Sequence, residues 1–169
     1  MKTCLVGCGG IAAVHGSVLT SGIDTEFVAA ADIKLEKAQS YAENFHTKPY
    51  PSLESMLEAE KPDVLHICTP HYLHVPMAIY SLERNINVFM EKPPAISFDQ
   101  LEELKKAAAK SDAQLGFCYQ NRYNASIRAA KDLIDSGKSG KVLGARAFVT
   151  WCRGAAYYTE SGWRGSLKT

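Results

Sequence analysis

A lysine lies between an apolar segment and two prolines. The packing of a buried strand does not require a charged residue at this position. Residues 88–90 have the composition of a buried strand, and Glu91, Lys92, Pro93 and Pro94 follow them directly. An ammonium at such a place can hold a substrate hydroxyl and stabilise an alkoxide that develops there. Lys92 is therefore a candidate catalytic residue. The alternative is a lysine that extends its amine from the strand end into water.

A glycine-rich segment near the N-terminus has the spacing of a phosphate-binding turn. Six residues after the first apolar run match the pattern G-x-G-x-x-G/A, and these are Gly7, Cys8, Gly9, Gly10, Ile11 and Ala12. In this pattern Gly7 permits a tight turn, Gly9 lets the backbone approach a pyrophosphate, and Ala12 allows a helix to pack closely on a strand. The unpaired N–H groups at the helix N-terminus then favour phosphate, so the segment predicts dinucleotide binding.

An aspartate ends the second apolar run, twenty positions after Ala12. A carboxylate at Asp32 can accept hydrogen bonds from ribose hydroxyls and repels a 2′-phosphate, and Ile33 would line the same turn. NAD is therefore the predicted cofactor, while Lys34 keeps NADP possible. Asp32 could also serve as a helix N-cap, which is compatible with the first role.

Strand-like and helix-like segments alternate along the chain. Strands are expected at residues 3–7, 26–32, 63–68, 87–90 and 114–119, and helices at 11–19, 35–45, 52–60, 75–82, 97–109 and 127–134. This alternation predicts an α/β fold with a doubly wound parallel sheet of the Rossmann type. Ligands bind at the carboxyl ends of the strands in such folds, so the turns after the strands should line one crevice.

Further candidate residues follow from that placement. They are Cys68, Thr69 and Pro70 after one strand, Glu91 and Lys92 after the next, and Gln120 and Arg122 after another. His71 and His74 stand close to the first of these turns. A lone histidine is more often a hydrogen-bonded structural residue than an acid or base, so neither is predicted to be catalytic.

The character of the chain changes near Gly137. Residues 138–153 have the pattern of one long strand without an answering helix. We therefore expect a dinucleotide-binding domain over residues 1–120, and the truncated start of an α/β substrate and oligomerisation domain over residues 121–169.

Composition excludes several classes of protein. The 169 residues are 46% hydrophobic and 22% charged with a formal net charge of +1, which argues against nucleic acid as a partner. No apolar stretch reaches the length of a bilayer span, so no membrane association is expected. The five cysteines and five histidines show no metal-ligand spacing, and a reduced, cytoplasmic protein without a metal is predicted.

Taken together, these segments resemble the Gfo/Idh/MocA oxidoreductases, the family of glucose–fructose oxidoreductase and inositol dehydrogenase. The resemblance is carried by GCGGIAAVH (7–15), ADIKLEKA (31–38), DVLHICTPHYLHVPMAIYSLERNINVFMEKPPAIS (63–97) and YQNRYNASIRAAKDLIDSGKSGKVL (119–143). It implies an NAD(P)-dependent oxidoreductase that transfers hydride between a nicotinamide and a sugar, cyclitol or related polyol. The present chain would be the cofactor-binding half.

The resemblance also implies roles for single residues. Lys92 would face the nicotinamide and the substrate, His74 would line the cofactor cleft, and Trp163 and Arg164 would belong to a segment that reaches towards the cofactor. Relatives carry a glycine-rich segment with an aspartate and a histidine beyond the point where this sequence stops. The chain by itself is therefore expected to be catalytically incomplete, and the full-length form to be a homo-oligomer.

Two other functions remain open at this stage. The first is a dinucleotide-binding module without turnover of its own. The second is an NAD-using glycosidase, since a few similar proteins oxidise and re-reduce a sugar within each cycle.

Overall fold

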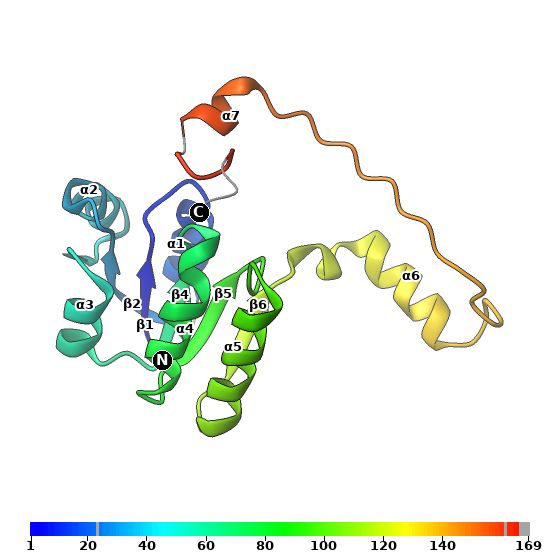
Figure 1. Cartoon of the computed structure of the whole chain (residues 1–169), viewed down its shortest axis with the longest axis horizontal. Coiled ribbons are helices and arrows are strands. Elements are labelled where there is room, and N and C mark those ends of the chain that lie inside the picture. Colours follow the sequence, from blue (N-terminus) through cyan, green and yellow to red (C-terminus); the bar gives the residue numbers. More distant parts are fainter. Residues whose placement is uncertain (23, 161, 166–169) are drawn as a thin grey trace. The chain divides into compact units, whose positions relative to one another are not determined.

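The computed structural model describes residues 1–22, 24–160 and 162–165 (Figure 1). The chain divides into two compact units, one over Met1–Cys118 and one from Tyr119 onward, and each is described by itself.

A parallel sheet of six strands forms the centre of the described part of the first unit. The strands are β1 (Lys2–Val6), β2 (Glu26–Ala31), β3 (Lys48–Tyr50), β4 (Val64–Ile67), β5 (Asn87–Glu91) and β6 (Leu115–Cys118). Their order is β3-β2-β1-β4-β5-β6, and every neighbouring pair is parallel. The direction of winding reverses between β1 and β4, as in doubly wound nucleotide-binding folds. The predicted fold class is confirmed.

The helices of this unit cover the two faces of the sheet. They are α1 (Ala12–Ser21), α2 (Leu35–Phe45), α3 (Leu53–Glu60), α4 (His74–Leu82) and α5 (Phe98–Lys110), with a short 3₁₀ turn η1 (His71–Leu73) before α4. Ser52 caps α3 and Ser97 caps α5, each accepting a backbone N–H three residues on.

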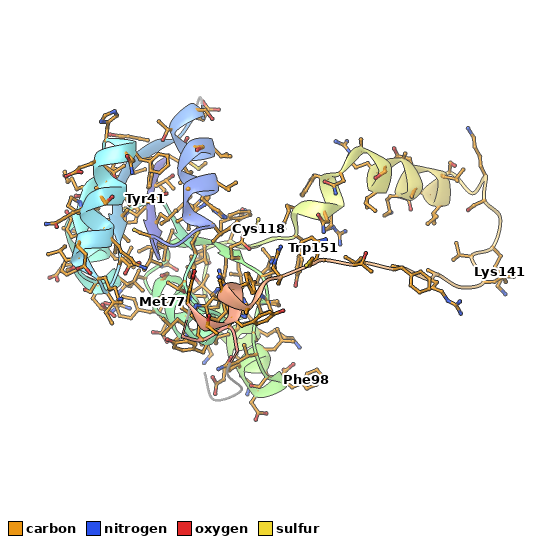
Figure 2. The ribbon with its side chains drawn as sticks, turned by 90° about the horizontal axis from the view of Figure 1, so that it is seen from above. Tyr41, Met77, Phe98, Cys118, Lys141 and Trp151 are labelled. Atoms are coloured by element: carbon orange, nitrogen blue, oxygen red, sulfur yellow. The ribbon has the colours of Figure 1, made fainter. Side chains whose placement is uncertain are left out.

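Alternation along the strands separates two cores. On one face Val6, Ile67 and Met90 belong to a large apolar cluster that includes residues of α3, α4 and α5. On the other face Leu5 joins a smaller cluster with Ala12 of α1 and Tyr41 of α2. The hydroxyl of Tyr41, labelled in Figure 2, donates to the carbonyl of Ala12 at 2.8 Å, so α2 is fixed to the start of α1.

Strand β3 was not foreseen from the sequence. It has three residues with Pro49 in the middle, which gives no periodicity to recognise. β3 pairs only with β2 and forms one edge of the sheet. An edge strand tolerates proline because one side of its backbone has no ladder partner.

The second unit contains η2 (Gln120–Tyr123), α6 (Ala125–Asp135) and the short α7 (Ala155–Thr159). The prediction of a strand over residues 138–153 is wrong. The segment pairs with no strand among the described residues, and Figure 1 draws it as an extended trace between α6 and α7. Lys141 and Trp151 mark the same segment in Figure 2. A strand needs a neighbour for its backbone hydrogen bonds, and the apolar pattern alone does not supply one.

No helix among the described residues has the length and apolar character required to cross a membrane.

A buried carboxylate connects the edge strand to the rest of the sheet. Glu60, at the end of α3, accepts hydrogen bonds from the Tyr50 hydroxyl at 2.6 Å and from the Lys48 ammonium at 2.9 Å. The Lys2 ammonium lies 3.0 Å from its second oxygen. The bonds from Tyr50 and Lys48 lower the pKa of Glu60 from 4.5 to about 2.

This depressed pKa predicts acid sensitivity. Stability from ionised Glu60 is complete above about pH 5 and is lost as the pH falls from there towards 2, because the unfolded chain takes up the proton first. In Glu60→Gln the acid-induced loss of unfolding free energy over this range should shrink by about 2 kcal/mol. Urea unfolding at several pH values measures it. Glu58→Gln changes an exposed glutamate of the same helix and serves as the control; equal acid dependence in all three proteins would contradict the prediction.

Candidate functional site

The turns that follow β1, β2, β4 and β5 lie at one end of the sheet. Val6 pairs with Ala31 on one side and with Ile67 on the other, and Ile67 pairs with Met90. These four residues therefore form one row across the sheet. The glycine turn, Asp32, the Cys68 turn and Lys92 all begin within two residues of this row.

Gly7 is required by the close approach of the β1 and β4 turns. Its φ is +94°, and a Cβ at this position would lie 2.7 Å from the carbonyl carbon of Cys68 and from the backbone nitrogen of Thr69. Its own N–H donates to the carbonyl of Ala31 at 2.8 Å. At Gly9, by contrast, a Cβ would meet no described atom within 4 Å. The turn is thus closed against the sheet at Gly7 and open outward at Gly9.

Asp32 holds the glycine turn through its side chain. One carboxylate oxygen accepts the Cys8 N–H at 2.9 Å, and the other accepts the Lys34 N–H at 2.9 Å. Each oxygen has a second lone pair, so the carboxylate can still accept from a ribose hydroxyl. The neighbouring Ile33 is 93% exposed.

The N-terminus of α1 follows the glycine turn directly. The residue before the helix is Ile11, and no side chain caps its first N–H groups in the described structure. Such groups carry a partial positive charge and bind anions. The open position at Gly9 lies two residues earlier in the same turn.

The turn after β4 contributes a hydroxyl and a thiol. Oγ1 of Thr69 is buried and has no hydrogen-bond partner among the described residues, which is costly for a polar atom. Burial raises the pKa of the Cys68 thiol, and burial together with Asp32 raises that of Cys8 to about 12. Neither thiol is suited to act as a nucleophile.

His74 joins two turns of the site. It is 0% exposed, with Nδ1 at 2.8 Å from the carbonyl oxygen of Pro93 and Nε2 at 3.0 Å from that of Thr69. Both ring nitrogens therefore face the backbone of the protein. Its effect on a ligand would pass through the positions of these two turns.

Lys92 is exposed at the end of β5. Its ammonium has no hydrogen bond or ion pair within the part of the chain that the structure describes, and its backbone N–H lies 3.3 Å from an oxygen of Glu91. The amine is therefore free to bind a ligand. Glu91 itself is buried, so the two neighbouring charges have opposite environments.

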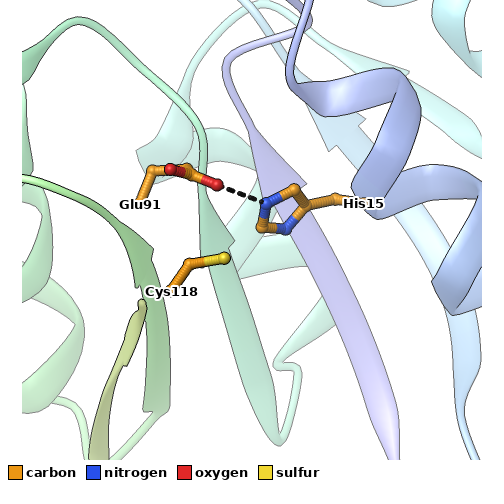
Figure 3. Close-up of side chains that lie close together, drawn as sticks. All are labelled: His15, Glu91 and Cys118. Atoms are coloured by element: carbon orange, nitrogen blue, oxygen red, sulfur yellow. Dashed lines mark hydrogen bonds and ion pairs between the residues drawn. The ribbon is translucent and has the colours of Figure 1, made fainter. Parts of the chain in front are cut away.

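A buried polar group beside Lys92 was not found from the sequence. Nε2 of His15 lies 3.1 Å from an oxygen of Glu91 (Figure 3). Nδ1 of His15 lies 3.0 Å from Nδ1 of His66. The thiol of Cys118 also hydrogen bonds to Glu91. The sequence carried one signal: His15 interrupts the small apolar residues of a helix that packs on the sheet.

Four further candidates belong to the second unit. Gln120 and Arg122 lie in η2, and Arg164 stacks over the ring of Tyr157 at 4.3 Å, next to Trp163. Their contribution to the site stays a prediction.

The arrangement defines a class of protein. A parallel sheet that reverses at β1 and β4, with an open glycine turn on β1 and a carboxylate at the end of β2, is a Rossmann dinucleotide-binding domain. The family model described as "Oxidoreductase family, NAD-binding Rossmann fold" (Gfo/Idh/MocA) matches residues 1–119. The chain belongs to this family, which confirms the resemblance and the predicted NAD-binding fold.

Three known relatives are similar over at least 81% of this chain. The D-glucoside 3-dehydrogenase of Escherichia coli is 28% identical over 96% of this chain and 46% of its own length. The WlbA dehydrogenase of Bordetella pertussis, solved with NADH and UDP-GlcNAcA, is 30% identical with a TM-score of 0.89, over 97% of this chain and 50% of that chain. The myo-inositol dehydrogenase of Lactobacillus casei, solved with NAD(H) and myo-inositol, is 26% identical with a TM-score of 0.76, over 81% of this chain and 42% of that chain. The chain thus spans about half the length of these relatives.

Substitution by alanine should lower stability at Gly7 and lower the affinity for NAD at Gly9. Gly7→Ala should lower the unfolding free energy by about 2–4 kcal/mol, because it adds left-handed strain and a clash with backbone atoms. Gly9→Ala should leave stability unchanged but reduce affinity for NAD at least about tenfold, because its methyl group fills the open side of the turn. Urea unfolding and calorimetric titration measure the two quantities.

Gly144→Ala is the matched control, since its Cβ would also meet no described atom and the residue lies outside the glycine turn. A Gly7→Ala protein as stable as the wild type would show that the contact with the β4 turn is not as close as described.

Proposed function

We propose that this chain is the cofactor-binding part of an NAD-dependent dehydrogenase that acts on a CH–OH group of a sugar, cyclitol or related polyol. The observation that carries the proposal is the single row of Ala31, Val6, Ile67 and Met90, which sets the glycine turn and Lys92 at the same end of the sheet. The sugar and inositol dehydrogenases among its relatives support the class of substrate.

The residues present fit a dinucleotide. The open Gly9 and the uncapped start of α1 suit a pyrophosphate, and the carboxylate of Asp32 suits a ribose. The buried Thr69 hydroxyl, which has no partner among the described residues, would gain one from a ligand seated above the β4 turn. When bound, NAD supplies a hydride acceptor at its nicotinamide ring.

Lys92 would manage the proton of the substrate hydroxyl. In oxidation the neutral amine accepts that proton while the two electrons leave the carbinol carbon as hydride, so the substrate becomes a carbonyl compound. In reduction the ammonium returns the proton to the developing alkoxide. His74 would hold the turn of Lys92 through the Pro93 carbonyl.

The charge of Asp32 favours NAD over NADP. A 2′-phosphate would meet a carboxylate whose two oxygens are already fixed by the backbone N–H groups of Cys8 and Lys34. The exposed Lys34 side chain is the feature that could admit NADP.

The remaining expectations extend the proposal to the whole protein. Residues 1–120 would form the dinucleotide-binding domain and residues 121–169 the start of a substrate and oligomerisation domain. We also propose that Gln120, Arg122, Trp163 and Arg164 bind the cofactor. We further propose a cytoplasmic homo-oligomer.

Calorimetric titration with NAD and NADP tests the cofactor. The wild-type chain should bind NAD at least about tenfold more tightly than NADP, and Asp32→Asn should reduce that ratio several-fold because the repelling charge is gone. Equal affinity of the wild type for both nucleotides would remove the assigned role of Asp32. Absence of binding to either would reject the proposed function.

The reaction is tested by measuring NAD reduction by the full-length protein with a panel of sugars, cyclitols and polyols. Lys92→Met should lower kcat at least about a hundredfold, since it removes the proton-transfer group. Lys106→Met is the control, because it removes an exposed lysine of α5 that has no part in the proposed site. Full turnover in Lys92→Met would exclude Lys92 as the catalytic residue.

A further inference from the structure

The polar cluster formed by His15, His66, Glu91 and Cys118, here called the His15 network, has no part in the function proposed above. Its members come from α1, β4, β5 and β6. They lie on the sheet face opposite the large apolar cluster, because Ile67 and Met90, which adjoin His66 and Glu91, point into that cluster. His15 and Glu91 are both buried.

The contacts within the His15 network indicate which atoms carry its protons. Burial, with the charge on His15 as a second cause, lowers the pKa of His66 to about 4, so this ring is neutral near pH 7. The two Nδ1 atoms of His15 and His66 are 3.0 Å apart, so one proton lies between them. Nε2 of His15 is then the atom that donates to Glu91 at 3.1 Å.

Glu91 is a carboxylate with several donors. Burial alone would raise its pKa, but hydrogen bonds from His15 and Cys118 outweigh this effect and lower the pKa. Its second oxygen lies 3.3 Å from the backbone N–H of Lys92. A continuous path therefore runs from α1 through His15 and Glu91 to the backbone of Lys92.

We propose that His15 is a positioning residue: it joins the helix that begins at the glycine turn to the turn that carries Lys92, and it holds the lysine at a fixed place relative to the pyrophosphate site. The inference rests on the proposed function for the identity of the ligand. His15 has no contact with the reacting atoms in this account, and it acts through Glu91.

A metal site is the competing interpretation. One ligand atom each from His15, Glu91 and Cys118 lie within 4.8 Å of one another, which suits Zn²⁺ in residue type. However, these groups already satisfy one another as donors and acceptors. A metal would have to displace the His15 proton and the Cys118 proton. The hydrogen-bonded network needs no additional component.

A comparison of NAD with ADP-ribose, which lacks the nicotinamide, distinguishes a loss of positioning from general damage to the fold. NAD and ADP-ribose both occupy the pyrophosphate and ribose sites, but only NAD reaches the turn of Lys92 with a nicotinamide. In His15→Leu, affinity for NAD should fall about tenfold more than affinity for ADP-ribose, because the turn of Lys92 is no longer fixed. His15→Gln keeps a side-chain donor for Glu91 and should restore NAD affinity to within about threefold.

Val18→Ala changes an exposed residue of the same helix and is the matched control. Cys118→Ala removes the second donor to Glu91 and should give a smaller loss in the same direction, which keeps the test available if His15→Leu does not fold. Equal losses for NAD and ADP-ribose in His15→Leu would overturn the proposal, because general damage to the fold would explain them.

The amide signal of Lys92 gives a measurement that needs no nucleotide. In protein labelled with ¹⁵N-lysine, and with the signal assigned by Lys92→Arg, His15→Leu should shift this amide and speed its hydrogen exchange, whereas Val18→Ala should not. A wild type that binds neither nucleotide would reject the proposed function, yet the amide would still report the connection. An unchanged amide in His15→Leu, or stoichiometric Zn²⁺ binding that Cys118→Ala abolishes, would overturn the inference.

Discussion

The absence of a side chain at Gly7 is the constraint on which the site depends. The β1 and β4 turns approach so closely there that a Cβ would overlap the backbone of Cys68 and Thr69. This approach lets the two central strands end side by side at the point where the winding of the sheet reverses. The glycine turn, the Thr69 hydroxyl and, one strand further, Lys92 then share one end of the sheet.

The two faces of the central strands have different tasks. One face of β4 and β5 carries Leu65, Ile67, Val88 and Met90, which form the apolar core and hold the strands in register. The other face carries His66 and Glu91 in the alternate positions, where they meet His15. A single pair of strands thus supplies hydrophobic stabilisation on one side and a polar network below the lysine turn on the other.

The sequence predicted those parts of the structure that are determined by patterns within short segments. The glycine spacing and the apolar runs are properties of short segments, and they predicted the fold and most element bounds. The strand β3 is too short and polar to produce such a pattern, and residues 138–153 have the pattern of a strand without a partner to pair with. The contact of His15 with Glu91 joins residues 76 positions apart, so it depends on the folded register of four elements. No short motif encodes that register.

Asp32 gives one carboxylate two tasks, and this limits how the protein can change. The same oxygens that would distinguish one nucleotide from the other also hold the backbone of Cys8 and Lys34 in place. Exchange of this aspartate for a residue that accommodates a 2′-phosphate would loosen the turn proposed to bind the diphosphate of either nucleotide. Redesign of cofactor preference therefore has to begin with a replacement acceptor for the Cys8 N–H, and only then alter the charge.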